Sequence, residues 1–126
     1  MTLEPKKVMI IEDEQDAAEL FAEMMRLNGF RVIKTYASTP AMSLIAQEKP
    51  DLILLDIMMP EISGLEILRY MRATPELASI PVVVISARAT PADVRSGLEA
   101  GASIYLTKPV GYNDLKNAVD SLLQGT

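Results

Sequence analysis

Four consecutive aliphatic residues, Leu52 to Leu55, restrict the fold of this chain more than any other stretch. The short run is bounded by Pro50-Asp51 and by Asp56, which predicts a strand. Because polar residues do not alternate with the apolar ones, both faces of this strand are expected to be buried, as in a parallel sheet covered by helices. Asp56 would then end the strand at the sheet edge where such folds bind ligands. The simpler alternative is a turn aspartate before Met58-Met59-Pro60.

Missing residue types exclude several kinds of chemistry. The 126 residues include no Cys and no His, so disulfides, thiolate chemistry, Cys-ligated metals and the usual general base are ruled out. A reactive site must use carboxylates, Lys and hydroxyls. The net charge of -5 argues against a nucleic-acid surface. Residues 1–7 lack the apolar core of a signal peptide and no run is long enough for a membrane span, so we expect a cytoplasmic protein that is not inserted in a membrane.

Strand-like and helix-like segments alternate along the chain. The predicted strands cover residues 8–11, 30–35, 51–56, 80–86 and 104–106, and each is followed by a helical pattern. The alternation with short connections predicts an α/β fold, a five-stranded parallel sheet with helices on both faces in the doubly wound (βα)5 flavodoxin-like arrangement. We expect a single domain over residues 1–126, with its core at about 7–123.

Local signals predict where the helices begin and end. The signals are a stop at Asn28-Gly29, an N-cap and N1 proline at Thr39-Pro40, a start at Ser63-Gly64, a capping box from Thr90 to Asp93 and a stop at Gly101. In the first helix, from about residue 16 to 28, the apolar residues at helical spacing are Ala17, Leu20, Phe21, Met24 and Leu27.

Polar side chains end or follow four of the five predicted strands. They are Glu12, Asp13, Asp56, Ser86 and Lys108. Because parallel strands end at one sheet edge, these residues should converge. Converging carboxylates repel one another unless a hard cation such as Mg2+ binds them, and a cation beside a lysine attracts a phosphoryl group. Asp56 would then be a nucleophile that forms an acyl phosphate, with the Ser86 hydroxyl as a hydrogen-bond donor.

Each of these residues also has a purely structural interpretation. Glu12 and Asp13 would be the charged start of a helix, and Ser86 an ordinary turn residue. Lys108 would be a solvated loop lysine, and Tyr105 a half-buried strand aromatic. A chain without a functional site at this edge would require all of these interpretations to be correct at once.

With these residues at these strand ends, the chain resembles a receiver domain of the bacterial two-component response regulators, including the single-domain, chemotaxis-type members. The resemblance implies that Asp56 accepts a phosphoryl group from a histidine kinase or a phosphotransfer protein. It implies a Mg2+ or Mn2+ site made by Glu12, Asp13, Asp56 and the backbone carbonyl of Met58, with Glu12 acting mainly through a water molecule. Glu12 stands where the family more often has Asp, and Ser86 where it more often has Thr.

The resemblance also assigns roles around the phosphoryl group. Ser86, Lys108 and Tyr105 would be the switch residues, and the backbone N–H groups of Met58 and Ala87 would donate to phosphoryl oxygens. Lys108-Pro109 matches the family's cis peptide bond. The side chains of Met58 and Arg88 would set the lifetime of the acyl phosphate.

A phosphorylated receiver would act as a switch and not as a turnover enzyme. The surface expected to change is formed by the helix after residue 90, the strand at 104–106 and the last helix. It would bind a downstream protein or a second copy of the chain, but no nucleic acid.

Other functions fit the sequence less well. A flavodoxin-like carrier needs a hydroxyl- and Gly-rich loop where Glu12 to Asp16 stand, and a haloacid dehalogenase-type phosphatase needs an acid-base Asp at Met58. The remaining alternatives are a pseudo-receiver that is never phosphorylated and a receiver cut from a longer response regulator.

Overall fold

The short aliphatic runs form the five strands of one parallel sheet. A computed structural model describes residues 4–123; residues 1–3 and 124–126, which the domain prediction included, lie outside it. The sheet order is β2-β1-β3-β4-β5, with all neighbours parallel, which confirms the predicted fold. The strands are β1 (Lys7–Ile11), β2 (Arg31–Thr35), β3 (Leu52–Leu55), β4 (Val82–Ser86) and β5 (Ile104–Thr107).

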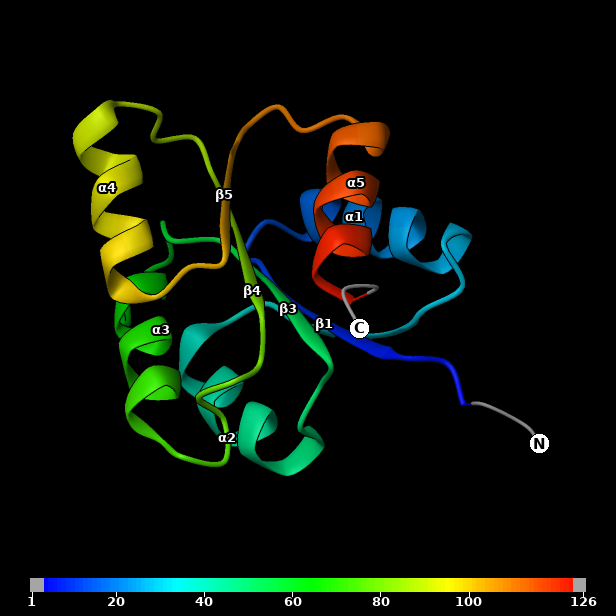
Figure 1. Cartoon of the computed structure of the whole chain (residues 1–126), viewed down its shortest axis with the longest axis horizontal. Coiled ribbons are helices and arrows are strands. Elements are labelled where there is room, and N and C mark those ends of the chain that lie inside the picture. The colour runs from blue at the N-terminus through cyan, green and yellow to red at the C-terminus, as the bar shows by residue number, and fades with distance from the viewer. Residues whose placement is uncertain (1–3, 124–126) are drawn as a thin grey trace.

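Five helices cover the two faces of the sheet (Figure 1). Helices α1 and α5 lie on one face, and α2, α3 and α4 lie on the other. Within residues 4–123, none of the helices is long and apolar enough to cross a membrane. Their bounds are α1 (Gln15–Leu27), α2 (Ser38–Glu48), α3 (Gly64–Ala73), α4 (Pro91–Ala100) and α5 (Tyr112–Leu123).

The central strands are buried on both sides, as the unbroken aliphatic run in β3 predicts. Alternate residues of each strand point to opposite faces, so the sheet contributes to two separate cores. Met9, Ile53 and Val84 pack with residues of α2 and α3. Ile10 and Leu54 pack with residues of α1 and α5. The sheet is therefore a rigid layer from which the loops at its edge project.

The strand register aligns the carboxyl ends of the strands. Ile11 pairs with both Thr35 and Leu55, and Ser86 pairs with Thr107. The residues that follow β1, β3, β4 and β5 therefore lie along one edge. The chain changes its winding direction between β1 and β3, the position where doubly wound sheets form a ligand-binding crevice.

Most of the predicted helix ends are present. Ser63 caps α3 by accepting a hydrogen bond from the Leu65 N–H at 3.1 Å. Thr90 and Asp93 form the capping box of α4, which ends at the left-handed Gly101 with φ +118°. Gly29 has φ +87° after α1. Local sequence is sufficient at these positions because each cap is made within a few residues.

The predicted start of α2 at Thr39-Pro40 is wrong. The helix begins at Ser38, and Ala37 occupies the N-cap position without a side-chain cap. Pro40 lies in the first helical turn, where its missing N–H has no helical partner to lose. Ser38 does not cap the helix because its hydroxyl bonds instead to the Pro60 carbonyl, 22 residues away.

The predicted apolar face of α1 is partly wrong as well. Leu20 and Leu27 are 54% and 72% exposed, although Phe21 is buried as expected. The other buried residues of the helix are Ala18, Ala22 and Met25. The two alanines allow α1 to lie close to the sheet, so the buried stripe is rotated toward them and away from Leu20.

Arg72 joins three segments on the α3–α4 side of the sheet. Its guanidinium donates hydrogen bonds to the carbonyls of Gly101 at 3.0 Å, Ala78 at 3.0 Å and Ile80 at 2.7 Å. No ion pair to Arg72 occurs among residues 4–123. Burial lowers the pKa of this guanidinium from its ordinary value. Arg72 thus ties the end of α3 to the α3–β4 loop and to the end of α4.

Candidate functional site

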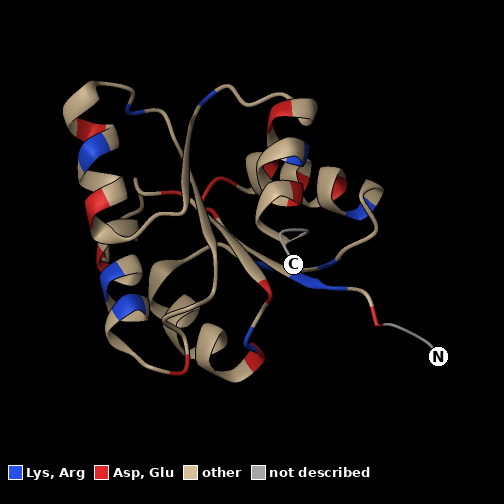
Figure 2. Cartoon of the chain, in the orientation of Figure 1, with Lys and Arg blue, Asp and Glu red and all other residues tan. Residues whose placement is uncertain are grey.

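Three carboxylates meet at the sheet edge between β1 and β3. Glu12 and Asp13 follow β1 and Asp56 follows β3, and one oxygen from each lies within 4.8 Å of the others. Figure 2 shows acidic residues together where these two strands end. Glu12 and Asp56 are only 2% and 6% exposed, whereas Asp13 is exposed. Two acids are therefore nearly withdrawn from water in a confined space.

Backbone hydrogen bonds fix the two buried acids. The Glu12 N–H donates to the Thr35 carbonyl at 3.1 Å, and the Asp56 N–H donates to the Ile11 carbonyl at 3.0 Å. These bonds continue the strand ladders by one residue beyond β1 and β3. The backbone of both acids is therefore held by the sheet, while their side chains project beyond its edge.

Lys108 is the cation of this cluster. Its Nζ donates to Glu12 Oε1 at 2.9 Å and lies 3.5 Å from Asp56 Oδ2. The Lys108 N–H donates to the Ser86 carbonyl at 2.8 Å, and the Lys108-Pro109 peptide bond is cis. One ammonium therefore contacts two of the three carboxylates.

Burial and hydrogen bonding set the charges in the cluster. Burial raises the pKa of Glu12 above its ordinary value, because the hydrogen bond from Lys108 only partly offsets the loss of water. Burial acts to lower the pKa of Lys108, but the hydrogen bond to Glu12 and the charge of Asp56 outweigh it and the pKa is raised. The charged form of Lys108 is thus favoured, whereas Glu12 is easier to protonate than a carboxyl group in water.

The donor set fits a hard divalent cation. Carboxylate and carbonyl oxygens are the ligands that Mg2+ prefers, and it is usually held by one or two carboxylates with several waters. The exposed Asp13 leaves room for such waters on the solvent side, while Glu12 and Asp56 close the protein side. The acidic cluster is therefore compatible with Mg2+ binding.

A second hydrogen-bonded group lies at the ends of β4 and β5. Ser86 is fully buried, and its hydroxyl oxygen accepts a hydrogen bond from the Arg88 N–H at 3.1 Å. The Tyr105 hydroxyl donates to the Arg88 carbonyl at 2.8 Å. The Arg88 guanidinium lies 3.9 Å from Asp93 in the cap of α4. Arg88 therefore links the Ser86 loop to both β5 and α4.

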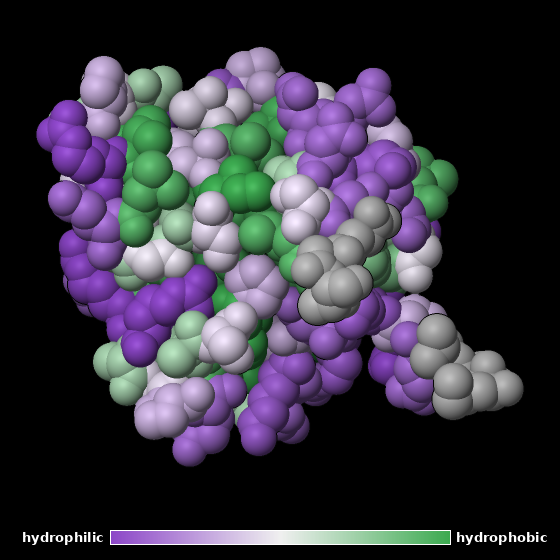
Figure 3. All heavy atoms as spheres, viewed as in Figure 1, coloured by the Kyte–Doolittle hydropathy of each residue, from purple (hydrophilic) through white to green (hydrophobic). Residues whose placement is uncertain are grey.

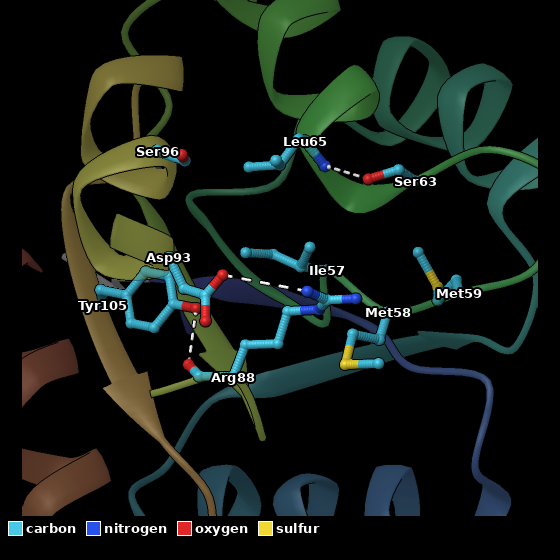
Figure 4. A pocket seen from close by; sticks show the side chains of 9 residues that line it. All are labelled: Ile57, Met58, Met59, Ser63, Leu65, Arg88, Asp93, Ser96 and Tyr105. Atoms are coloured by element: carbon cyan, nitrogen blue, oxygen red, sulfur yellow. Dashed lines mark hydrogen bonds and ion pairs between the residues drawn. The ribbon is translucent and has the colours of Figure 1, made fainter. Parts of the chain in front are cut away.

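A cavity of about 560 Å³ separates this group from the loop after β3. Figure 4 shows the Arg88 side chain extending toward Met58, with Tyr105 beside α4. A Cβ at Gly97 would lie 2.6 Å from the Tyr105 ring, so the ring packs directly on the backbone of α4. The remaining lining residues are Ile57, Met59, Ser63, Leu65, Asp93 and Ser96.

The structure brings the predicted site residues into two neighbouring groups. Glu12, Asp13, Asp56 and Lys108 form the acidic cluster, and Ser86, Arg88 and Tyr105 form the second group. Between them the Met58 N–H donates to Asp56 Oδ1 at 3.0 Å, while the Met58 side chain is 47% exposed and Ala87 is exposed.

Three residues near the site were missed by sequence reasoning. Gly64 was noted only as a helix start, yet a Cβ there would lie 2.4 Å from the Asp56 carbonyl oxygen. Ser38 and Gly97 contact the loop after β3 and the Tyr105 ring, respectively. Only the position of Gly64 beside the Ser63 cap gave a sequence signal; the other two contacts depend on distant segments.

Comparison with known proteins agrees with this geometry. The response regulator receiver domain family matches residues 8–120. The polar-differentiation response regulator DivK of Brucella anthropi is 34% identical over 119 residues, which cover 94% of this chain and 97% of that protein. DivK of Brucella ovis is also 34% identical, over 118 residues covering 94% of this chain and 96% of that protein.

Solved structures agree as well. The receiver domain of the Francisella response regulator 1452 superposes with a TM-score of 0.89 at 28% identity, covering 95% of this chain and 98% of that one. The signal receiver domain of a signal transduction histidine kinase from Syntrophus aciditrophicus superposes with a TM-score of 0.89 at 30% identity. The match covers 96% of this chain and 92% of that one.

The chain belongs to the response regulator receiver domain family. Members of this family are signalling proteins of two-component systems and not turnover enzymes. The strand-end residues of this chain can therefore be interpreted as parts of a receiver.

Proposed function

We propose that this receiver domain is a phosphoacceptor switch that is phosphorylated on Asp56. The observation that supports this most strongly is the environment of the Asp56 carboxylate. It is buried at the β1–β3 switch point, with Oδ1 bonded to the Met58 N–H and Oδ2 near Lys108. An Asp56 oxygen attacks the phosphorus of the donor, the bond from phosphorus to the donor's leaving group breaks, and that group departs with the electron pair.

Residues of this chain would stabilise the charge on the transferred group. Lys108 can exchange one carboxylate for a phosphoryl oxygen, and the N–H groups of Met58 and Ala87 can donate to others. The Ser86 oxygen already accepts from Arg88, so its own proton can be donated to the phosphoryl group. Glu12, Asp13, Asp56 and the Met58 carbonyl would hold Mg2+ or Mn2+, which when bound would neutralise phosphoryl charge.

The switch would work through the Ser86–Arg88–Tyr105 group. A Ser86 hydroxyl drawn toward the phosphoryl group moves the loop that carries the Arg88 carbonyl, and this loosens its bond to the Tyr105 hydroxyl. The Tyr105 ring can then turn into the cavity beside α4. The surface of α4, β5 and α5 changes shape as a result.

Partners follow from this scheme. A histidine kinase or a phosphotransfer protein would supply the phosphoryl group, and a downstream protein or a second copy of the chain would bind the α4–β5–α5 surface. Apolar residues are visible on the face between α4 and α5 in Figure 3, and Leu98 of α4 is 47% exposed. We assign the receiver core to residues 7–123 and the protein to the cytoplasm.

The test is chemical. With acetyl phosphate and Mg2+, intact-mass measurement should detect one added phosphoryl group that is labile to base and hydroxylamine. Asp56→Asn should take up none, because an amide is not a nucleophile toward phosphorus under these conditions. Equal labelling of the variant, or no labelling of the original protein, would favour the pseudo-receiver alternative.

Asp13→Ala should weaken Mg2+ binding by at least about tenfold, or about 1.4 kcal/mol, because a carboxylate ligand is lost. Lys108→Ala should bind Mg2+ at least as tightly, since the ammonium no longer competes for Glu12 and Asp56. Titration of Mg2+ followed by amide chemical shifts near Asp56 measures both affinities. Equal affinity of Asp13→Ala and the original protein would reduce Asp13 to a charged residue before α1.

The phosphorylated form should decay by itself over minutes or longer. Neither Met58 nor the Arg88 guanidinium can deprotonate the attacking water. Met58→Asn, which can orient a water, should speed decay by about tenfold, equivalent to about 1.4 kcal/mol in the barrier. Single-turnover decay of the original protein, Met58→Asn and Arg88→Ala tests this. Identical rates in all three would remove both side chains from control of lifetime.

A further inference from the structure

A buried hydroxyl on α2 holds the loop that follows Asp56. Ser38 is 1% exposed and is the first residue of α2. Its Oγ donates to the Pro60 carbonyl at 3.1 Å and accepts from the Ile62 N–H at 3.1 Å. Among residues 4–123, no other side-chain hydrogen bond joins residues 57–62 to a different element. One hydroxyl therefore fixes the distal half of this loop.

The backbone between the two contacts needs such support. Glu61 lies between Pro60 and Ile62 and has φ +70°, a left-handed conformation that is unfavourable for a residue with a side chain. The Ser38 hydroxyl bonds to the carbonyl before Glu61 and to the amide after it. A strained backbone conformation of this kind persists only when surrounding contacts hold it in place.

The same loop carries the groups that face the Asp56 carboxylate. The Met58 N–H bonds to Asp56 Oδ1, and the Met58 carbonyl is the backbone oxygen that would complete the cation site. Ile57 is held by the Gly64 N–H at 2.9 Å, so the proximal end of the loop is fixed at α3. Met58 lies between this fixed end and the part held by Ser38. A shift of residues Pro60–Ile62 would therefore displace Met58.

We propose that Ser38 is a positioning residue for the Asp56 site. Its hydroxyl holds the β3–α3 loop in the shape that directs the Met58 carbonyl to the cation and the Met58 amide to Asp56. Without the hydroxyl, Glu61 relaxes toward negative φ and Met58 moves with it. This inference rests on the proposed function, because it concerns the cation and phosphoryl groups of the same site.

Ser38→Ala tests the proposal, with two matched controls. Thr39→Ala removes the exposed hydroxyl of the next residue, and Tyr112→Phe removes a single hydrogen bond to Asn28 between α5 and the end of α1. In the metal-free protein, Ser38→Ala should speed hydrogen exchange of the Ile62 amide by about tenfold or more, because that amide loses its acceptor. Neither control should change it.

Two functional measurements distinguish an effect on Mg2+ affinity from an effect on the rate of phosphorylation. Ser38→Ala should weaken Mg2+ binding by about three- to tenfold, measured by amide chemical shifts, because the Met58 carbonyl is displaced. Labelling by acetyl phosphate should slow at low Mg2+ and recover at saturating Mg2+. Ser38→Cys keeps the buried volume with a weaker hydrogen-bonding group and should bind Mg2+ with intermediate affinity, so it decides the matter if the alanine variant is poorly folded.

Two results would overturn the role of Ser38. Faster exchange at Ile62 with unchanged Mg2+ affinity would make the hydroxyl a structural contact only. Unchanged exchange at Ile62 would show that the hydroxyl does not hold the loop. Both are distinct from a failure of the proposed function, in which the original protein itself would neither bind Mg2+ nor accept a phosphoryl group.

Discussion

Gly64→Ala should destabilise the protein by at least about 2 kcal/mol and slow the phosphorylation of Asp56. The added methyl group would lie 2.4 Å from the Asp56 carbonyl oxygen and 2.7 Å from the Ile57 Cα. These neighbours are backbone atoms at the end of the central strand, and they cannot rotate away as a side chain could. Relief of the clash must therefore move Asp56 or the first turn of α3.

The expected loss of stability is opposite to what the helix propensities of glycine and alanine alone would give. Alanine favours a helix over glycine by about 1 kcal/mol, and Gly64 is the first residue of α3. Gly111→Ala is the control, because no atom beyond its chain neighbours lies within 4 Å of a Cβ there. Gly111 precedes α5 and accepts from the Leu115 N–H, so alanine at this cap should cost less than about 1 kcal/mol. Urea denaturation measures both variants. Equal stability of the two would show that the α3 start is loosely packed.

Arg72→Met should lower the free energy of unfolding by about 3 kcal/mol, because three backbone carbonyls lose a charged hydrogen-bond donor. Methionine retains the apolar stem, so most of the effect belongs to the guanidinium. The loss should loosen the α3–β4 loop and the end of α4 together, since Arg72 bonds to both.

Arg69→Met provides the comparison on the same helix. Arg69 is exposed and makes no hydrogen bond or ion pair among the described residues, so its replacement should leave stability within about 0.5 kcal/mol. Chemical denaturation with urea gives both values. If the two substitutions had the same effect, the three hydrogen bonds of Arg72 would contribute nothing to stability.

Topology explains why the sequence predicts so much of the site. The unbroken aliphatic run in β3 requires a sheet buried on both faces, and parallel strands end at a shared edge. Glu12, Asp56 and Lys108 can therefore be expected to meet although up to 96 residues separate them. No detail of side-chain packing is needed for that prediction.

Contacts between distant segments could not be predicted in the same way. Helical spacing places Leu20 in the apolar stripe of α1, but the small residues Ala18 and Ala22 decide which side packs on the sheet. Local preference predicts a helix start at Thr39, whereas the helix begins at Ser38, whose hydroxyl bonds to a loop 22 residues away. Arg72 has no local signal because its partners lie in other elements.

The switch residues could be predicted only in part. The family resemblance assigns Ser86 and Tyr105 to the switch, and Arg88 to the lifetime of the acyl phosphate. The bond from the Tyr105 hydroxyl to the Arg88 carbonyl and the contact of the Tyr105 ring with Gly97 appear only in the structure. They depend on how α4 is docked, which a strand-and-helix pattern does not determine.

Reduction of the phosphorylated protein with borohydride tests the central claim most directly. The reagent converts an aspartyl phosphate into homoserine, so peptide mass spectrometry identifies the residue that carried the phosphoryl group. After treatment with acetyl phosphate and Mg2+, we expect homoserine at position 56 and at no other position. Homoserine at position 12 or 13, or its complete absence from a protein that binds Mg2+, would contradict the assignment of Asp56 as the phosphoacceptor.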